Sequence, residues 1–364
     1  MNRARLVSLS LFVCTLGAGS ALLAPAQNAA ANTPTVTSTV TTPTTTTTTS
    51  TTTTTPTPPP AARQRISAGR LFRVDHMRVT VIGERVPIAG TVTPYVAGQR
   101  VLLRAYVGTR LFTKALLNVK PVKGHTYGVY RWVLRAPASG KVTVHVYHAA
   151  SATLGEFSSE LDYTALRPSA NFGETGPIVR LIQQRLLALH LYIPQTGVYD
   201  QKTGLAIDTY HRLLGWGVSQ IADPRTVDAL IAGKGRFIVH FPHQGFHAEG
   251  DLSIQVLALI NGSKVSWLLP ISSGKPSTPT VLGSFQIYYR EPEFTSDGMY
   301  FSDFFHTGYA IHGYDPSPDY PASHGCMRLP MVDAIPVYDR LALGEWVDTY
   351  YTSGYRYDWV GNDI

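Results

Sequence analysis

The stretch Ala310-Ile-His-Gly-Tyr-Asp315, followed after a loop by Ala322-Ser-His-Gly-Cys-Met-Arg-Leu329, decides the character of the last part of this 364-residue chain. His312 ends a run of strand-forming residues, and Gly325 permits a tight turn just before Cys326. The intervening loop, 314–321, contains three prolines, so its closure costs less conformational entropy than that of a flexible loop. We therefore expect His312 and Cys326 to meet in a β-rich domain that spans residues 235–351.

These residues match the needs of nucleophilic catalysis by a cysteine. His312 supplies a base, and the backbone N–H groups of Gly325 and Cys326 are candidate donors to an oxyanion. His324 is a second histidine that favours the thiolate. Arg328 is placed to clamp a substrate carboxylate and to lower the pKa of the thiol.

The run from Ser323 to Arg328, together with His312-Gly313, resembles the active-site signature of the L,D-transpeptidases. The resemblance extends upstream through three short segments and the stretch 299–312: Ser273-Gly274-Lys275, Thr278-Pro279-Thr280 and Gly283-Ser284-Phe285. It implies a β-rich catalytic fold without metal or cofactor. It also implies Cys326 as the acyl acceptor, His312 as a base held by the Gly313 carbonyl, Ser323 and Arg328 as substrate contacts, and Tyr300 and Phe301 near a mobile lid.

The reaction implied by the resemblance has two halves. Cys326 attacks the peptide bond after the diamino acid of a peptidoglycan tetrapeptide stem, forms a thioester and releases D-alanine. An amine of another stem then takes the acyl group, which cross-links or remodels the wall. With water as acceptor the enzyme is an L,D-carboxypeptidase instead. Carbapenem-type β-lactams, which are strained cyclic amides, are the expected inhibitors.

Two other classes of protein compete with this interpretation. A zinc hydrolase would use His306, His312, His324 and Cys326, but their spacing matches no compact zinc motif and Arg328 would repel the cation. An inert wall-binding protein would keep the fold without activity. Reactivity of Cys326 as a thiolate near neutral pH distinguishes this alternative from an enzyme.

A helical period runs through residues 169–234. Val179, Ile182, Leu186 and Leu189 recur at three- and four-residue steps after Pro177, which suits a first helical turn. The segments 176–179, 197–200 and 223–226 resemble the three-helix peptidoglycan-binding domain. The resemblance implies glycan contact through this domain, although Tyr210-His211 replace the Phe-Gln usual in the family.

Short runs with strand alternation, such as Val142, Val144 and Val146, fill residues 67–168 and predict an immunoglobulin-like β-sandwich that acts as a spacer or docking module. Residues 1–31 have the features of a signal peptide, 32–66 form a Thr/Pro-rich stalk, and 352–364 form a tail. The protein is thus expected to be secreted or wall-associated, or membrane-anchored if residues 1–31 are retained.

Charge and cysteine content support an exported wall protein. The formal charge of +7 is scattered along the chain, which favours loose attraction to an anionic wall polymer and gives no support for nucleic-acid binding. Beyond Cys14, in the signal segment, Cys326 is the single cysteine, so it has no partner for an intramolecular disulfide.

The pattern of the last domain predicts strands at 236–241, 252–260, 264–269, 285–289 and 309–312. One helix is expected near 331–342. Pro336 inside it predicts two short pieces or a kink, because proline removes a helix hydrogen bond.

Overall fold

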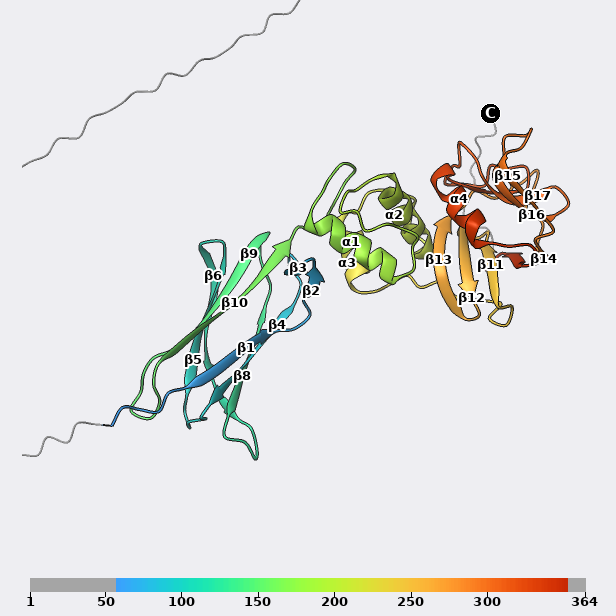
Figure 1. Ribbon diagram of the computed structural model, residues 1–364. Coiled ribbons are helices and arrows are strands. Elements are labelled where there is room, and N and C mark those ends of the chain that lie inside the picture. The colour runs from blue at the N-terminus through green and yellow to red at the C-terminus, as the bar shows by residue number, and fades with distance from the viewer. Residues whose placement is uncertain (1–56, 353–364) are drawn as a thin grey trace, which may run out of the picture. The chain divides into compact units, whose positions relative to one another are not determined.

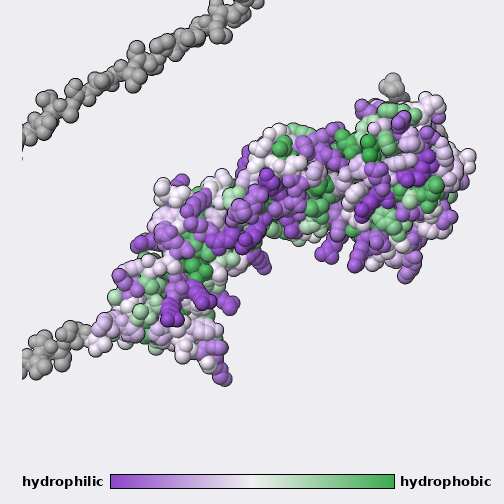
Figure 2. All heavy atoms as spheres, viewed as in Figure 1, coloured by the Kyte–Doolittle hydropathy of each residue, from purple (hydrophilic) through white to green (hydrophobic). Residues whose placement is uncertain are grey.

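The computed structural model describes residues 57–352, which form a β-sandwich, a group of three helices and a β-rich domain in that order (Figure 1). The predicted signal peptide, most of the stalk and most of the C-terminal tail lie outside these residues. Within residues 57–352, no helix has the length and apolar character needed to cross a membrane. The face shown in Figure 2 is mainly hydrophilic, with apolar side chains in small patches.

Two sheets form the sandwich. The first has the order β1-β4-β8-β7, with β1 (Arg63–Ala68), β4 (Val86–Thr93), β7 (Lys120–Pro121) and β8 (Gly128–Leu134). The second has the order β2-β3-β10-β9-β5-β6, with β2 (Phe72–Val74), β3 (Met77–Val81), β5 (Arg100–Val107), β6 (Arg110–Asn118), β9 (Gly140–His148) and β10 (Phe157–Leu166). Alternate residues such as Ile88 on β4 and Val144 on β9 share one buried core. The immunoglobulin-like identity stays a prediction.

The sandwich begins earlier than predicted. Strand β1 starts at Arg63 and pairs antiparallel with β4, so the last four residues assigned to the stalk belong to the sheet. Its side chains alternate between exposed and half-buried, with Arg63 and Arg65 outward and Ile66 inward. Because most of the alternating residues are polar, the strand period is hidden in the composition of this segment.

The helical region contains α1 (Pro177–Ala188), α2 (Gln201–Leu213) and α3 (Pro224–Ile231). The carboxylates of Asp200 and Asp223 cap α2 and α3 by accepting backbone N–H bonds. Val179, Ile182, Leu186 and Leu189 are all buried as the period predicts, and Leu189 is the residue that caps the end of α1.

The two residues that depart from the peptidoglycan-binding pattern are part of this helical core. Tyr210 is fully buried, and His211 is buried with Nε2 2.7 Å from the Thr226 hydroxyl. These side chains therefore stabilise the packing of α2.

Two sheets and one helix form the last domain. The first sheet has the order β13-β12-β11-β19-β14, with β11 (Phe246–Asp251), β12 (Val256–Asn261), β13 (Lys264–Pro270), β14 (Gly283–Gln286) and β19 (Trp346–Tyr350). The second has the order β15-β16-β17-β18, with β15 (Tyr289–Phe294), β16 (Tyr300–His306), β17 (Tyr309–Gly313) and β18 (Met327–Leu329), and α4 (Met331–Arg340) follows it. Leu257, Ile311 and Val337 belong to one core shared by both sheets and α4.

Several predicted elements of this domain are wrong in detail. Residues 236–241 form no strand, because the backbone N–H groups of His240 and Phe241 donate to the buried Glu249 carboxylate instead of to a ladder. Residues 252–255 form a turn before β12, and 285–289 divides between β14 and β15. The region 331–342 contains one helix, α4, with Pro336 inside it. Because Pro336 lies beyond the first turn and has no N–H group, the helix lacks one backbone hydrogen bond there.

The helical region and the last domain are joined by specific polar contacts. The buried Arg212 donates through Nη1 to the carbonyls of Gln255 (2.7 Å) and Ile271 (3.0 Å), and through Nη2 to Asp208 (2.6 Å). Lys202 on α2 forms an ion pair with the buried Asp333 on α4. Each of these contacts crosses the boundary that the sequence places at residue 234, apart from the Arg212–Asp208 pair within α2.

Candidate active site

The pairing of β17 and β18 brings the predicted catalytic residues to one face. The strands are parallel, and Ile311 pairs with Met327 while His312 pairs with Arg328. Ile311 and Met327 point into the core, so the alternate residues His312, Cys326 and Arg328 share the opposite face. His312 and Cys326 are therefore diagonal neighbours on adjacent chain segments.

A hydrogen-bonded turn holds the cysteine at the start of β18. The hydroxyl of Ser323 donates to the Cys326 carbonyl (2.6 Å) and accepts from the Gly325 N–H (3.0 Å). Ser323 is buried, and these two bonds place its hydroxyl within the turn. Its role as a substrate contact stays a prediction. The Gly325 N–H is likewise engaged, so Cys326 N–H remains as the predicted oxyanion donor.

Gly325 is required by both backbone conformation and space. Its φ of +128° is one that residues with a side chain rarely adopt. A Cβ atom at this position would lie 2.3 Å from the ring of Tyr309. The close approach of Tyr309 thus fixes one wall of the turn that carries the thiol.

His312 is oriented and kept neutral by its surroundings. The side chain is buried, and its Nδ1–H donates to the Gly313 carbonyl (2.9 Å), the contact that the resemblance implies. This bond leaves Nε2 as the basic nitrogen. Burial is the main cause that lowers the pKa of His312 to about 4, and the Arg328 charge lowers this pKa further. The hydrogen bond to Gly313 acts in the opposite direction and raises it.

Cys326 is held as a thiol in the resting site. Its Sγ donates to the Gly308 carbonyl at 3.6 Å. Burial raises the pKa of the thiol above its usual value, and this outweighs the opposing effects of a backbone hydrogen bond with Ala310 and the Arg328 charge. The expected lowering by Arg328 is present, but it is not the dominant effect.

Arg328 lies between the catalytic face and the loop that precedes Cys326. Its guanidinium stacks over the ring of Tyr314 at 4.0 Å and lies 3.5 Å from the Ala322 carbonyl. Tyr314 in turn meets His312 edge-on, with ring centroids 5.8 Å apart. The half-buried cation therefore has a fixed position beside His312, as a clamp for an anion requires.

The remaining predicted residues lie around this centre. His324 is exposed, and its ring has no hydrogen-bond partner among residues 57–352. Tyr300 pairs with Gly313 across β16 and β17, and its ring packs on Phe301 and Phe294. Phe294 is 62% exposed at the end of β15. The β15–β16 hairpin thus presents an aromatic cluster beside the strand that carries His312.

Sequence reasoning missed a buried support for the cysteine turn. The side chain of Gln255 donates to the Ser273 hydroxyl (2.7 Å) and accepts the Ser273 N–H (2.8 Å). The Ser273 carbonyl then accepts the N–H groups of Ala322 and Ser323. Ser273 was noted within the resemblance, whereas Gln255, in a turn with φ of +54°, carried no local signal.

The upstream segments of the resemblance support the same turn. The hydroxyl of Thr278 donates to the Ser323 carbonyl (3.0 Å), and the hydroxyl of Thr280 accepts the Gly274 N–H (2.9 Å). Across residues 57–352, no three His, Cys, Asp or Glu side chains gather closely enough to hold a metal ion. The arrangement thus offers a thiol, a neutral base and a cation on one braced surface.

Residues 246–348 match the family model of the L,D-transpeptidase catalytic domain, and residues 175–230 match that of a peptidoglycan-binding domain. The chain therefore carries a catalytic domain of the L,D-transpeptidase family preceded by a peptidoglycan-binding domain. No curated protein matches the chain.

Three solved structures illustrate the similarity. An L,D-transpeptidase from Xylanimonas cellulosilytica is 28% identical, with a TM-score of 0.47, covering 50% of this chain and 97% of its own. The catalytic domain of an Enterococcus faecium L,D-transpeptidase acylated by ertapenem is 26% identical, with a TM-score of 0.26, covering 29% of this chain and 98% of its own. An L,D-transpeptidase from Mycobacterium smegmatis is 11% identical, with a TM-score of 0.26, covering 79% of this chain and 99% of its own.

Proposed function

We propose that this protein is an exported cysteine L,D-transpeptidase that cross-links or remodels peptidoglycan. The observation that carries the proposal is the shared face of His312, Cys326 and Arg328, fixed by the register of β17 and β18. The match of residues 246–348 to the catalytic-domain family supports the same activity.

The resting site favours a mechanism that starts from a neutral pair. At neutral pH Nε2 of His312 carries no proton, and the Cys326 thiol retains its own. Proton transfer from Sγ to Nε2 therefore accompanies attack of sulfur on the carbonyl carbon of the scissile bond. The C–N bond breaks, the amine of D-alanine takes the proton from His312, and the acyl group remains on sulfur as a thioester.

The second half of the reaction reverses the roles of these groups. An amine of another stem attacks the thioester carbonyl while His312 accepts its proton. The C–S bond then breaks as the new amide forms, and the departing sulfur takes the proton from His312. The Cys326 N–H is the remaining predicted donor to the oxyanion in both halves. Arg328 provides a cation for a stem carboxylate, and the aromatic cluster on the β15–β16 hairpin provides the lid that limits water.

The deciding experiment uses a disaccharide-tetrapeptide, with and without an amine-bearing second stem, and identifies the products by mass. We expect D-alanine release with formation of a cross-linked dimer, and no product from Cys326→Ala. A tripeptide as the only product identifies a carboxypeptidase. Release of D-alanine by Cys326→Ala at the wild-type rate overturns the cysteine mechanism.

A further inference from the structure

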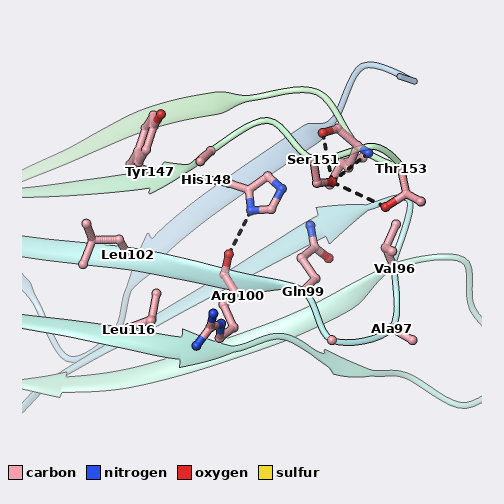
Figure 3. A pocket seen from close by; sticks show the side chains of 13 residues that line it. Val96, Ala97, Gln99, Arg100, Leu102, Leu116, Tyr147, His148, Ser151 and Thr153 are labelled. Atoms are coloured by element: carbon pink, nitrogen blue, oxygen red, sulfur yellow. Dashed lines mark hydrogen bonds between the residues drawn. The ribbon is translucent and has the colours of Figure 1, made fainter. Parts of the chain in front are cut away.

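A pocket of about 440 Å³ opens in the β-sandwich, a different domain from the one that contains Cys326 (Figure 3). One wall is the segment 96–100 at the start of β5, and the other is the segment 147–154 at and after the end of β9. Its volume falls in the range of roughly 300–1,000 Å³ that small-molecule sites occupy. No acidic side chain lines it, and Arg100 at its rim is the only lysine or arginine of the lining.

The side chain of Gln99 is the most unusual feature of this pocket. Only 5% of the residue is exposed, yet neither Nε2 nor Oε1 has a hydrogen-bond partner among the described residues. Its backbone is satisfied, since its N–H donates to Val96 (3.1 Å) and its carbonyl accepts from Val119 (2.8 Å). Figure 3 shows the carboxamide pointing into the space between the loops, on the side of Ser151. A ligand that supplies a donor and an acceptor together would satisfy this group.

His148 adds a second unmatched group on the opposite wall. Its Nδ1–H donates to the Arg100 carbonyl (2.9 Å), so in this tautomer Nε2 is an acceptor. This Nε2 is buried and has no hydrogen-bond partner in the described part of the chain. The ring stacks on Phe157 with centroids 5.1 Å apart, which holds its orientation. The site therefore needs a hydroxyl or another donor at this point.

The loop that closes the pocket is preorganised. The Ser151 hydroxyl accepts the Leu154 N–H (3.1 Å), and the Ser151 N–H donates to the Leu154 carbonyl (2.8 Å). Leu154 is itself buried in the sandwich core. A loop fixed in this way loses little conformational freedom when a ligand binds.

An exposed apolar row continues from the polar end of the pocket. Leu116, Leu102 and Tyr147 are aligned across β6, β5 and β9, because Leu102 pairs with both of the others. Leu116 is 56% exposed and Tyr147 is 41% exposed. The outer face of this sheet thus offers a flat apolar surface with an aromatic ring at its edge.

We propose that this pocket binds a pyranose unit of a glycan. Adjacent ring hydroxyls present a donor and an acceptor side by side. These are the hydrogen-bond partners that the Gln99 carboxamide and His148 Nε2 lack. The C–H face of the ring packs on the row that includes Tyr147. This inference gives the sandwich a carbohydrate-binding role that does not depend on the reaction at Cys326.

The test is saturation-transfer-difference NMR on the full chain, with methyl β-glucopyranoside and a β-1,4-linked tetramer of N-acetylglucosamine as probes. Gln99→Met removes the amide with little change in size, and Tyr147→Ala removes the exposed ring. Gln286→Met, at an exposed position on β14 and outside the peptidoglycan-binding domain, is the matched control. We expect wild type and the control to bind, and Gln99→Met and Tyr147→Ala to bind at least about tenfold more weakly.

Unfolding of Gln99→Met provides an independent readout. Because the substitution removes unmatched buried polar atoms, its thermal midpoint is expected to equal or exceed that of wild type. Binding of neither sugar by wild type, or undiminished binding by both Gln99→Met and Tyr147→Ala, overturns the proposal; the latter result would locate the sugar elsewhere. A clear fall in midpoint for Gln99→Met also overturns it, since the carboxamide then has an internal role.

Discussion

At the scale of single residues, the site combines two groups whose protonation states are set by burial. His312 is neutral because burial disfavours its charged form, and Cys326 is a thiol for the same reason. The nearby Arg328 charge does not reverse the second effect. Catalysis in such a site depends on proton transfer to an oriented base, so the protonation state of His312 sets its lower pH limit.

The pH dependence of kcat/KM follows from this arrangement. Because the pKa of His312 is lowered to about 4, its basic nitrogen is free above that pH and is blocked below it. We expect activity on a tetrapeptide substrate to fall only as the pH approaches 4, with circular dichroism confirming that the fold persists. An acidic limb near the ordinary histidine value of about 6.5 would contradict the assignment of His312 as a buried base.

Acylation by a carbapenem is the second prediction for the site. The thiol presents one nucleophile to the strained amide, and Arg328 presents a cation to its carboxylate. Intact mass of the chain without residues 1–31 is expected to show one adduct, and His312→Ala is expected to slow its formation by about 10²–10⁴-fold. An adduct on Cys326→Ala, or equal rates for wild type and His312→Ala, would refute the roles given to these residues.

At the scale of elements, the cysteine turn depends on a strand and a turn that lie far from it in sequence. Gln255 precedes β12, and its side chain holds Ser273, whose carbonyl receives the N–H groups just before Cys326. Buried groups that fix a reactive side chain in this way affect rate more than binding, because a small displacement misaligns the attacking atom.

Replacement of Gln255 by methionine tests this support. We expect kcat to fall by about 10- to 100-fold, while KM changes little, since Gln255 is buried away from solvent. Gln286→Met, on β14, is the control, because its Nε2 donates to the Gly344 carbonyl at an exposed position. A loss of stability alone, with kcat unchanged in the folded fraction, would show that Gln255 does not position the turn.

The same elements show what a sequence reveals and what it hides. Strand alternation placed β9 and β13 correctly, and the glycine before the cysteine predicted the turn that Gly325 makes. The role of Gln255 was missed, because it depends on Ser273, a partner that the tertiary fold brings near. The bonds of Ser323 to Gly325 and Cys326 are local, but the sequence carries no pattern that distinguishes them from other serine contacts. Residues 236–241 have strand propensity, but the carboxylate of Glu249, a long-range partner for their N–H groups, determines their conformation.

At the scale of the whole molecule, Arg212 connects the helical region to the last domain. Its guanidinium serves two carbonyls of one domain and the carboxylate of Asp208 in the other, and both side chains are almost fully buried. A charge pair buried at a domain junction makes the two folds cooperative, because removal of one partner leaves the other unpaired away from water.

Arg212→Met is therefore expected to destabilise the protein by about 3–5 kcal/mol in chemical denaturation. The double variant Asp208→Asn with Arg212→Met should recover part of this loss, because it removes the uncompensated carboxylate. If the single variant unfolds at the wild-type denaturant concentration, the Arg212 contacts contribute nothing to stability.

The Arg212 contact also bears on how such proteins arise by recombination. The two acceptors, the carbonyls of Gln255 and Ile271, belong to the main chain and would exist in any homologous catalytic domain, whereas the donor is one particular side chain of α2. A chimaera that received a foreign helical domain without this arginine would bury the Ile271 carbonyl without its donor, whereas the Gln255 carbonyl would keep the bond from the Ile271 N–H. The helical and catalytic domains are thus expected to be inherited together.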